Sequence, residues 1–374
     1  MKCRLFLAIA LTACLGTVSN AQPAGAKPGD AALRTKVAAA MEKGFGFLDQ
    51  QQRPEGYWSS AEYPGLTGLI VQAYLAAPGG VRRDSPAALK GLDFIRKHAR
   101  PDGSISGDRM ANYNTSVCMA TLLRRGEERD RKIAEAARGY LVGAQVRNSP
   151  AAANDGGFGY DPASGAKPSQ PDLDNTVFAL EALRLHREAN TARELPPGKD
   201  LNWQAAIDFI TRCQQLPGHN KEAWVSESES ERGGFVYSPV SDGKEPLRAY
   251  GTMTYAGVLS FLYADMKTDD PRLLAARDWL AKHYTLEENP GQGEQGLYYY
   301  YHLMAKGLSA LKVSELKIAA GRTVDWRAEL SAKLLSLQKP DGSWASENGR
   351  WMEKDPNLVT TYCLLALAYV QEQL

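Results

Sequence analysis

A turn motif that occurs six times limits the fold of this chain more than any other feature of its sequence. Each copy joins glycine to an aromatic or aliphatic residue and lies between two segments with a helical pattern. The glycines that mark the copies are Gly56, Gly103, Gly157, Gly234, Gly296 and Gly342. Their spacings are 47, 54, 77, 62 and 46 residues. A period of about 50 residues with helices on both sides predicts an array of helical hairpins.

The helical segments are of two kinds. The segment Ala87 to His98 places its apolar residues mostly on one face, as a helix on the outside of a protein does. The segments that follow the turns are apolar nearly all round, which is typical of helices buried between neighbours. These segments are Leu66 to Ala77, Val117 to Leu123, Val177 to Leu185, Tyr255 to Tyr263 and Val359 to Val370. Six outer and six inner helices predict an all-α fold, a single (α/α)6 toroid, and no run of β-branched residues is long enough to predict a sheet.

Composition excludes several classes of protein. Of the 374 residues, 44% are hydrophobic, which is enough for a packed core. Lysine and arginine number 44 and aspartate and glutamate 43, so the net charge is +1. A chain without a basic excess has no field that attracts nucleic acid, and no nucleic-acid partner is expected.

The N-terminus has the pattern of an export signal. A positive start, Met1 to Arg4, precedes the apolar segment Leu5 to Leu15, which is shorter than the about 20 residues of a membrane-spanning helix. Small residues at Ser19-Asn20-Ala21 suit a cleavage site. We therefore expect a signal peptide over residues 1–21, a flexible spacer over 22–30 and the toroid over 31–374. This predicts an exported protein of the bacterial periplasm or cell envelope.

A second interpretation of the signal stays open. Leu11-Thr12-Ala13-Cys14 resembles the bacterial lipobox, in which the cysteine is lipidated and becomes the new N-terminus. On this interpretation the signal ends before Cys14, and an N-terminal lipid attaches the protein to a membrane. The alternative is an ordinary cleavage after Ala21 that discards Cys14.

The remaining cysteines do not form a recognisable framework. Cys118, Cys213 and Cys363 lie far apart in apolar helical segments, without a CxxC pair. This spacing predicts buried small hydrophobic residues rather than disulfides or a zinc site.

The turn motifs carry a resemblance to a known family. The segment Lys43 to Trp58, with Gln52 and Gly56-Tyr57-Trp58, resembles the QW repeat of squalene-hopene and oxidosqualene cyclases, and partial copies lie at Lys90 to Ile105 and Lys333 to Trp344. The resemblance implies the α/α toroid that terpenoid cyclases share with protein prenyltransferase β subunits. This chain has one toroid, whereas squalene cyclases resemble two. We expect Gln52 and Gln338 to hydrogen-bond exposed backbone groups at a neighbouring helix end.

An acidic motif precedes the third inner helix. Pro171-Asp172-Leu173-Asp174-Asn175-Thr176 resembles the DxDDT segment of the same cyclases, which implies that Asp174 is the catalytic acid. Asp172 would be its electrostatic partner, and Asn175 would donate a hydrogen bond where the family has a further carboxyl. Asn114-Thr115 repeats the Asn-Thr step, which indicates scaffolding, but the two aspartates have no counterpart in other repeats. The alternative is that these residues are ordinary helix N-caps.

Rings near the same helix ends could stabilise a carbocation, because an aromatic face attracts cations. The candidates for binding substrate are Tyr250, Tyr255, Phe158, Tyr300, Tyr301 and His302. The alternative is that the rings only pack the helices together, and that His302 is a core residue bonded to backbone. His302 also resembles the zinc-ligand histidine of prenyltransferases, but the matching Asp and Cys are absent near Ala249 to Gly251. One histidine cannot make a tetrahedral zinc site, so no metal is expected.

The sequence therefore predicts an exported toroid that binds an apolar isoprenoid-like ligand and cyclises it by protonation from Asp174, with no cofactor. The alternative is a non-catalytic scaffold that binds an envelope protein, a peptide or a glycan through its mouth and its long loops, Val146 to Pro171 and Leu216 to Ala249. An apolar cavity beneath Asp174 favours the first function, and a plugged lumen favours the second.

Overall fold

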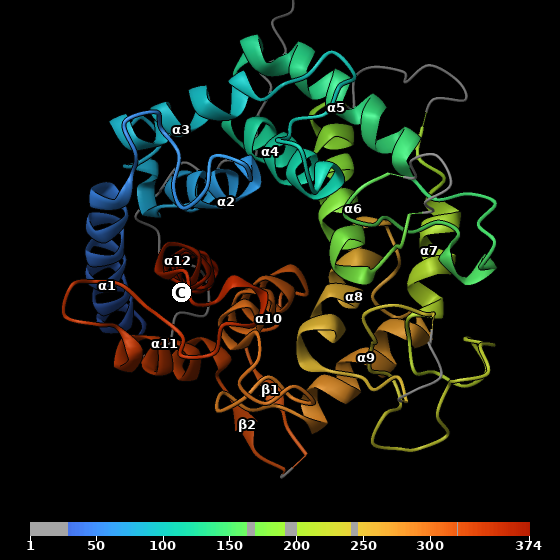
Figure 1. Cartoon of the computed structure of the whole chain (residues 1–374). Helices are drawn as coiled ribbons and strands as arrows, with labels where there is room; N and C mark the ends of the chain where they lie inside the picture. Colours follow the sequence, from blue (N-terminus) through green and yellow to red (C-terminus); the bar gives the residue numbers. More distant parts are fainter. Residues whose placement is uncertain (1–28, 163–168, 191–199, 241–245, 320) are drawn as a thin grey trace, which may run out of the picture.

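A computed structural model describes residues 29–162, 169–190, 200–240, 246–319 and 321–374. The predicted signal peptide, Cys14 and the spacer up to residue 28 lie outside the described residues. Within these ranges, twelve α-helices form two concentric rings (Figure 1). The inner ring holds α2 (Pro64–Leu75), α4 (Ala111–Arg125), α6 (Leu173–Ala189), α8 (Gly251–Tyr263), α10 (Leu297–Ala310) and α12 (Pro356–Gln373). The outer ring holds α1 (Asp30–Gln51), α3 (Pro86–Lys97), α5 (Arg131–Ala144), α7 (Trp203–Arg212), α9 (Pro271–Lys282) and α11 (Trp326–Leu337).

The inner ring closes on itself. Each inner helix packs against the next, and α12 returns to α2, so that the first and last repeats are neighbours. The outer helix α1 packs on both α11 and α12, and the side chain of Gln371 donates a hydrogen bond to the carbonyl of Arg34 at 2.7 Å. The prediction of an all-α, closed (α/α)6 toroid is confirmed.

Burial follows the two helical patterns in the sequence. Every residue of α2 is buried, whereas α3 buries mainly the face that carries Leu92 and Ile95. The inner helices can be apolar all round because neighbours, outer helices and the lumen side chains cover every side. Cys118, Cys213 and Cys363 are free and buried, as their apolar surroundings predict.

The turn glutamines connect successive repeats. The side-chain amide of Gln52 donates to the carbonyls of Gly56 and Ala87, at 3.0 and 2.9 Å. Gln338 makes the equivalent pair of bonds to Gly342 and Ala40. The prediction of a bond to a neighbouring helix end is confirmed for Gln52, whose acceptor Ala87 is the second residue of α3, whereas Ala40 lies in the middle of α1. Two further glutamines that the sequence comparison did not identify, Gln145 and Gln214, bond in the same way.

The turn glycines allow the turn to approach the next outer helix. Gly103 has φ +92°, and a Cβ there would lie 2.4 Å from the carbonyl oxygen of Ala136. No side chain fits in that space, and a positive φ strains other residues. The turn is therefore held against α5 at van der Waals distance.

A threonine near the start of each of five inner helices fixes the turn from the other side. Its hydroxyl accepts the backbone N–H of the residue one or two positions after the turn glycine, at 3.0–3.3 Å. These threonines are Thr67, Thr115, Thr176, Thr254 and Thr360. The Asn-Thr steps are therefore scaffolding, and in the fourth repeat, which has no Asn-Thr step, Thr254 makes the equivalent bond. In α10 the fourth residue is Tyr300, and His302 lies two residues beyond it.

Two short departures from the all-α pattern occur in the described residues. Strands β1 (Leu316–Lys317) and β2 (Thr323–Val324) form an antiparallel hairpin between α10 and α11, with Leu316 opposite Val324. A strand of two residues is too short to produce a recognisable alternation of apolar and polar residues in the sequence. None of the described helices combines the length and hydropathy needed to span a bilayer.

Candidate active site in the lumen

The amino-terminal ends of the inner helices surround a cavity of about 180 Å³ inside the ring. Nine of the seventeen described lining residues are aromatic, and among these seventeen Asp174 is the single charged side chain. The aromatic members are Tyr63, Tyr113, Tyr160, Phe178, Tyr237, Tyr250, Tyr299, Trp351 and Tyr362. The lumen at this end is therefore open and mostly apolar, with one carboxyl in it.

The mouth of the cavity is marked by exposed apolar side chains. Tyr237, Trp351 and Met352 line the cavity, yet they are 36%, 39% and 44% exposed. Met110, Trp351 and Met352 also have positive φ values, of 56°, 52° and 65°. Residues other than glycine adopt this conformation at an energetic cost, and such residues often cluster where ligands bind.

Asp172 and Asp174 have different roles. Asp172 is the N-cap of α6: one carboxyl oxygen accepts the backbone N–H of Asn175 at 2.7 Å, and the other accepts its side-chain amide at 2.8 Å. The capping interpretation is thus confirmed for Asp172 and does not apply to Asp174. Asp174 is the second residue of the helix and faces the cavity.

Asp174 is bonded across the lumen. Its Oδ1 accepts the hydroxyl of Tyr299, from α10, at 2.6 Å. Burial raises the pKa of Asp174 to about 6, and the Tyr299 hydroxyl opposes that rise by stabilising the ionised form. The tyrosine thus stabilises the conjugate base that proton donation would leave.

Asp172 is the weaker acid of the two. Burial, followed by the nearby charge of Asp174, raises the pKa of Asp172 to about 7, and the donors from Asn175 oppose that rise. Because the two carboxyls repel each other when both are ionised, the pair carries less than two negative charges near neutral pH.

Asn175 faces Asp172 rather than the cavity. Asn175 is 2% exposed, and its side-chain amide donates a hydrogen bond to Asp172. The oxygen of the same side chain, Oδ1, has no hydrogen-bond partner among the described residues. It donates a hydrogen bond as predicted, but the acceptor is the capping aspartate.

The predicted substrate-binding residues divide into two groups. Tyr250 lines the cavity. Tyr300 and Tyr301 lie in the ring wall, where their hydroxyls donate to the carbonyls of Thr285 and Leu286 at 3.0 and 2.6 Å. Tyr255 packs against Tyr300 with ring centroids 5.9 Å apart, and Phe158 is fully buried. These four rings lie outside the cavity lining.

His302 lies beneath the cavity in a column of rings. Its imidazole stacks on Tyr362, with centroids 5.8 Å apart, and also approaches Tyr299 and Tyr369. Burial lowers the pKa of His302 to about 3, so the ring is neutral. Its Nδ1 is buried without a partner among the described residues, which differs from a core histidine bonded to backbone. The column closes the floor of the cavity.

Several lining residues were missed from the sequence. Phe178 and Tyr362 belong to inner helices that are apolar all round, so no single face stands out. Their spacing does carry a signal, because Phe178 follows Asp174 by four residues and Tyr362 follows Leu358 by four, which places each pair on one helix face. Trp351 and Met352 lie in the three-residue 3₁₀ segment Arg350–Met352 between α11 and α12, which is too short to show a periodicity.

No group of three or more histidine, cysteine, aspartate or glutamate side chains suited to a metal ion occurs in the part of the chain that the structure describes. Among the described residues, Asp174 is therefore not part of a group that could hold a metal ion.

No protein-family model and no curated protein matches the sequence. Solved structures match the fold. The type II terpene cyclase MstE from Scytonema is 12% identical with a TM-score of 0.57, and the match covers 91% of this chain and 99% of the cyclase. An MstE variant in complex with its substrate, geranylgeranyl dihydroxybenzoate, matches with a TM-score of 0.55 at 12% identity, over 92% of this chain and 100% of the variant.

A GH76A α-1,6-mannanase from Salegentibacter sp. HEL1_6, in complex with α-1,6-mannotriose, matches equally well. It is 11% identical with a TM-score of 0.57, over 90% of this chain and 99% of the mannanase. At these identities the likeness establishes the fold and no more, and the same fold hosts unrelated chemistries. The chain is an α/α-toroid protein, similar in structure both to a terpene cyclase and to a glycan-binding mannanase.

Proposed function

We propose that this protein binds an apolar isoprenoid-like chain in the lumen cavity and cyclises it by proton transfer from Asp174. One observation carries the proposal: a carboxyl with a raised pKa is the single charged group among the described residues of a cavity lined by nine aromatic rings. The likeness in fold to a type II terpene cyclase is consistent with it.

The chemistry requires an acid, a stable conjugate base and protection of a cation. The proton on Asp174 passes to one carbon of an alkene, whose π electrons form the new C–H bond and leave the other carbon positive. Tyr299 then stabilises the Asp174 carboxylate. Ring faces attract the carbocation by about 0.5–2 kcal/mol per contact. A second double bond of the same chain attacks the cationic carbon with its π electrons, which closes a ring and moves the positive charge to another carbon. The cyclised cation then loses a proton to form a new double bond, and the Asp174 carboxylate takes up a proton from the product cation or from water.

The same lining argues against a sugar as the ligand. A glycan presents many hydroxyls, and burying them without partners costs free energy. Besides Asp174, the described lining offers tyrosine hydroxyls, the hydroxyl of Thr252 and the indole N–H of Trp351 as polar groups. The likeness to the mannanase keeps a glycan-binding scaffold as the alternative function, and the experiment below distinguishes the two.

The test is product formation. Purified protein is incubated with squalene, oxidosqualene and linear polyprenes, and the extracts are analysed by gas chromatography and mass spectrometry. We expect a cyclised product whose rate rises as the pH falls through about 6, because Asp174 must be protonated. Asp174→Asn should abolish it, and the control Asp208→Asn, on outer helix α7, should not. Unchanged polyprenes together with binding of mannotriose would replace this proposal with the scaffold.

Export is a proposal of its own. We propose that residues 1–21 direct the chain to the periplasm or envelope, with either lipidation of Cys14 or cleavage after Ala21. Intact mass measurement of protein from membranes tests it. A lipid-modified N-terminus at Cys14 supports attachment, an N-terminus at Gln22 supports a free exported protein, and an N-terminus at Met1 contradicts export.

A further inference from the structure

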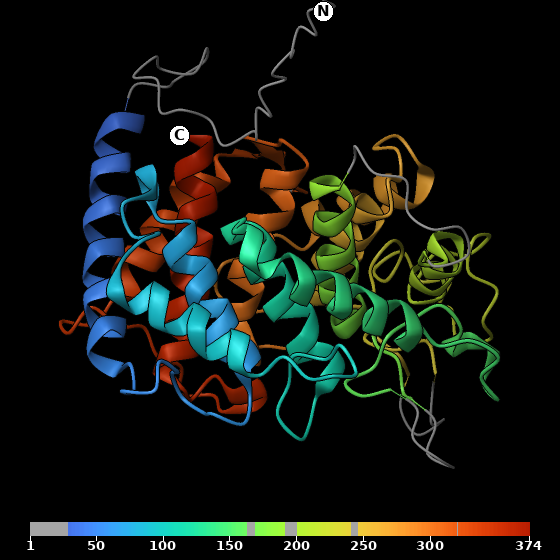
Figure 2. The ribbon, with the colours of Figure 1, turned by 90° about the horizontal axis from the view of Figure 1, so that it is seen from above.

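The carboxyl-terminal ends of the inner helices enclose a second hollow, at the opposite rim of the ring from Asp174. Figure 2 shows this rim at the top, where α12 ends. Two cavities of about 430 and 290 Å³ share Arg124, Leu185, Glu188 and Tyr369 in their linings, and together we call them the basic chamber. Glu181 lines the chamber seven residues after Asp174 on α6, which is about 10 Å along the helix. The ring column with His302 lies between the two hollows.

The centre of the basic chamber holds more positive than negative charge. Lys306, from α10, donates to one oxygen of Glu181 at 2.6 Å, and Arg124, from α4, donates to the other. The side chains of Lys306 and Glu181 are 9% and 6% exposed. Burial is the largest influence on the pKa of Glu181, but the two cations outweigh it and hold the pKa at about 2. One ionised carboxylate therefore faces two cations.

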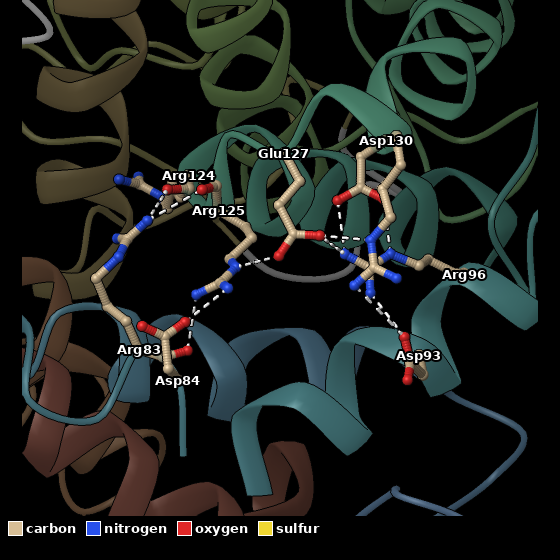
Figure 3. Close-up of polar contacts among 9 residues, drawn as sticks. Arg83, Asp84, Asp93, Arg96, Arg124, Arg125, Glu127 and Asp130 are labelled. Atoms are coloured by element: carbon tan, nitrogen blue, oxygen red, sulfur yellow. Dashed lines mark hydrogen bonds and ion pairs between the residues drawn. The ribbon is translucent and has the colours of Figure 1, made fainter. Parts of the chain in front are cut away.

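Two arginines of the chamber, Arg124 and Arg83, have guanidinium N–H groups that could donate hydrogen bonds to a ligand. The Nε of Arg124 is buried without a hydrogen-bond partner among the described residues. Arg83 donates to the backbone carbonyls of Arg124 and Arg125, with no carboxylate partner in the described part of the chain. Figure 3 shows the contrast, because Arg96 and Arg125 in the same region each bind carboxylates.

Besides Glu181, Lys306, Arg124 and Arg83, the lining of the basic chamber includes the carboxylates Glu188 and Glu372 and the cation Arg184, which pairs with Glu188. The four cations and three carboxylates of the lining leave a surplus of one positive charge.

Most of the remaining lining is apolar. Leucines from five of the six inner helices line it, at positions Leu75, Leu123, Leu185, Leu262 and Leu365. A cationic centre surrounded by leucines fits a ligand with an anionic head and an apolar tail, because each part then meets its complement.

We propose that the basic chamber binds an amphiphile with an anionic head group, a carboxylate or a phosphate, whose head lies against Arg124, the cation that lines both cavities, with Lys306 in the smaller cavity and Arg83 in the larger one. This site is separate from the Asp174 cavity and does not rest on the proposed cyclisation. The competing explanation is that these cations only balance the partial negative charge at the helix carboxyl ends. That explanation requires no ligand.

Calorimetric titration of the full chain tests the proposal, with dodecanoate and dodecyl phosphate below their micelle concentrations and dodecanol as the neutral control. We expect saturable binding of at least one anion and much weaker binding of dodecanol, and the stronger anion identifies the head group. Arg124→Gln should weaken binding at least about tenfold. The control for the loss of one positive charge, Arg131→Gln, lies on the outer helix α5 outside the chamber lining and should leave binding unchanged, as should Asp174→Asn.

A second variant tests the charge argument in the opposite direction. Glu181→Gln removes the carboxylate that competes with the ligand head for the two cations. The amphiphile that binds the wild type should therefore bind this variant several-fold more tightly. The ligand should also restore part of the melting temperature that this variant loses, because it then supplies the missing negative charge. No anion binding in the wild type and in Glu181→Gln would overturn the proposal, as would equal binding of dodecanol.

Discussion

At the scale of single residues, two aspartates two positions apart serve different purposes because a helix begins between them. The Asp172 side chain precedes the first turn and accepts the backbone N–H of Asn175, and Asp174 lies within that turn and faces the lumen. The sequence identified both residues and the Asn175 hydrogen bond. It could not identify the Tyr299 contact, because that partner lies 125 residues away on another helix of the ring.

Alanine substitutions separate the two roles. Asp172→Ala removes the N-cap of α6 and should lower the free energy of unfolding by about 0.5–2 kcal/mol. Asp174→Ala leaves the cap intact, so it should cost less stability while it removes the proton donor. Denaturant unfolding of both variants gives the comparison. A larger stability loss for Asp174→Ala than for Asp172→Ala would contradict the assignment.

The raised pKa of Asp174 makes its effect on stability depend on pH. Its pKa is about 6 in the fold, against about 3.9 for an unfolded aspartate. Its contribution to stability is therefore fully present below about pH 4 and is lost as the pH rises through about 6. Asparagine does not ionise, so the stability of Asp174→Asn lacks this pH dependence. The free energy of unfolding of the variant, relative to that of the wild type, should therefore be higher at about pH 8 than at about pH 4 by about 1–2 kcal/mol, after allowance for partial exposure. Chemical unfolding at both pH values measures this gain, and a constant difference would contradict it.

At the scale of elements, the repeated turn explains why the helices were predictable. Gln52, Gly103 and the turn threonines each make a bond or a close approach that recurs from repeat to repeat. Such recurrence is visible in a sequence. The β1–β2 hairpin and the loop with Trp351 and Met352 occur once each, so nothing in the repeat pattern indicates them.

The turn tryptophans are expected to be among the most stabilising side chains. Trp344 is fully buried, and its indole N–H donates to the carbonyl of Leu334 at 2.8 Å. Trp344→Ala should lower the free energy of unfolding by about 3–5 kcal/mol. Trp351, at the cavity mouth, is 39% exposed, and Trp351→Ala should change it by about 0.5 kcal/mol or less. Equal melting temperatures for the two variants would contradict the role given to the buried ring.

At the scale of the whole molecule, the parallel inner helices make the two ends of the lumen chemically different. Their amino-terminal ends surround an aromatic cavity with one acid, and their carboxyl-terminal ends surround a chamber with surplus cations. Positive partial charge at the amino-terminal ends favours the Asp174 carboxylate after proton transfer. The closed ring was predictable from six repeats. The residues that line its lumen were not predictable, because the inner helices are apolar on all sides and the sequence does not show which side faces the lumen.

Solvent isotope labelling tests the central claim most directly. The wild-type protein is incubated in D₂O with a polyprene, and the product is examined by mass spectrometry and NMR. If Asp174 donates the proton, the product carries one deuterium on the alkene carbon that was protonated, and Asp174→Asn forms no product. A product without deuterium, a product formed equally by Asp174→Asn, or complete recovery of every polyprene unchanged would contradict the account.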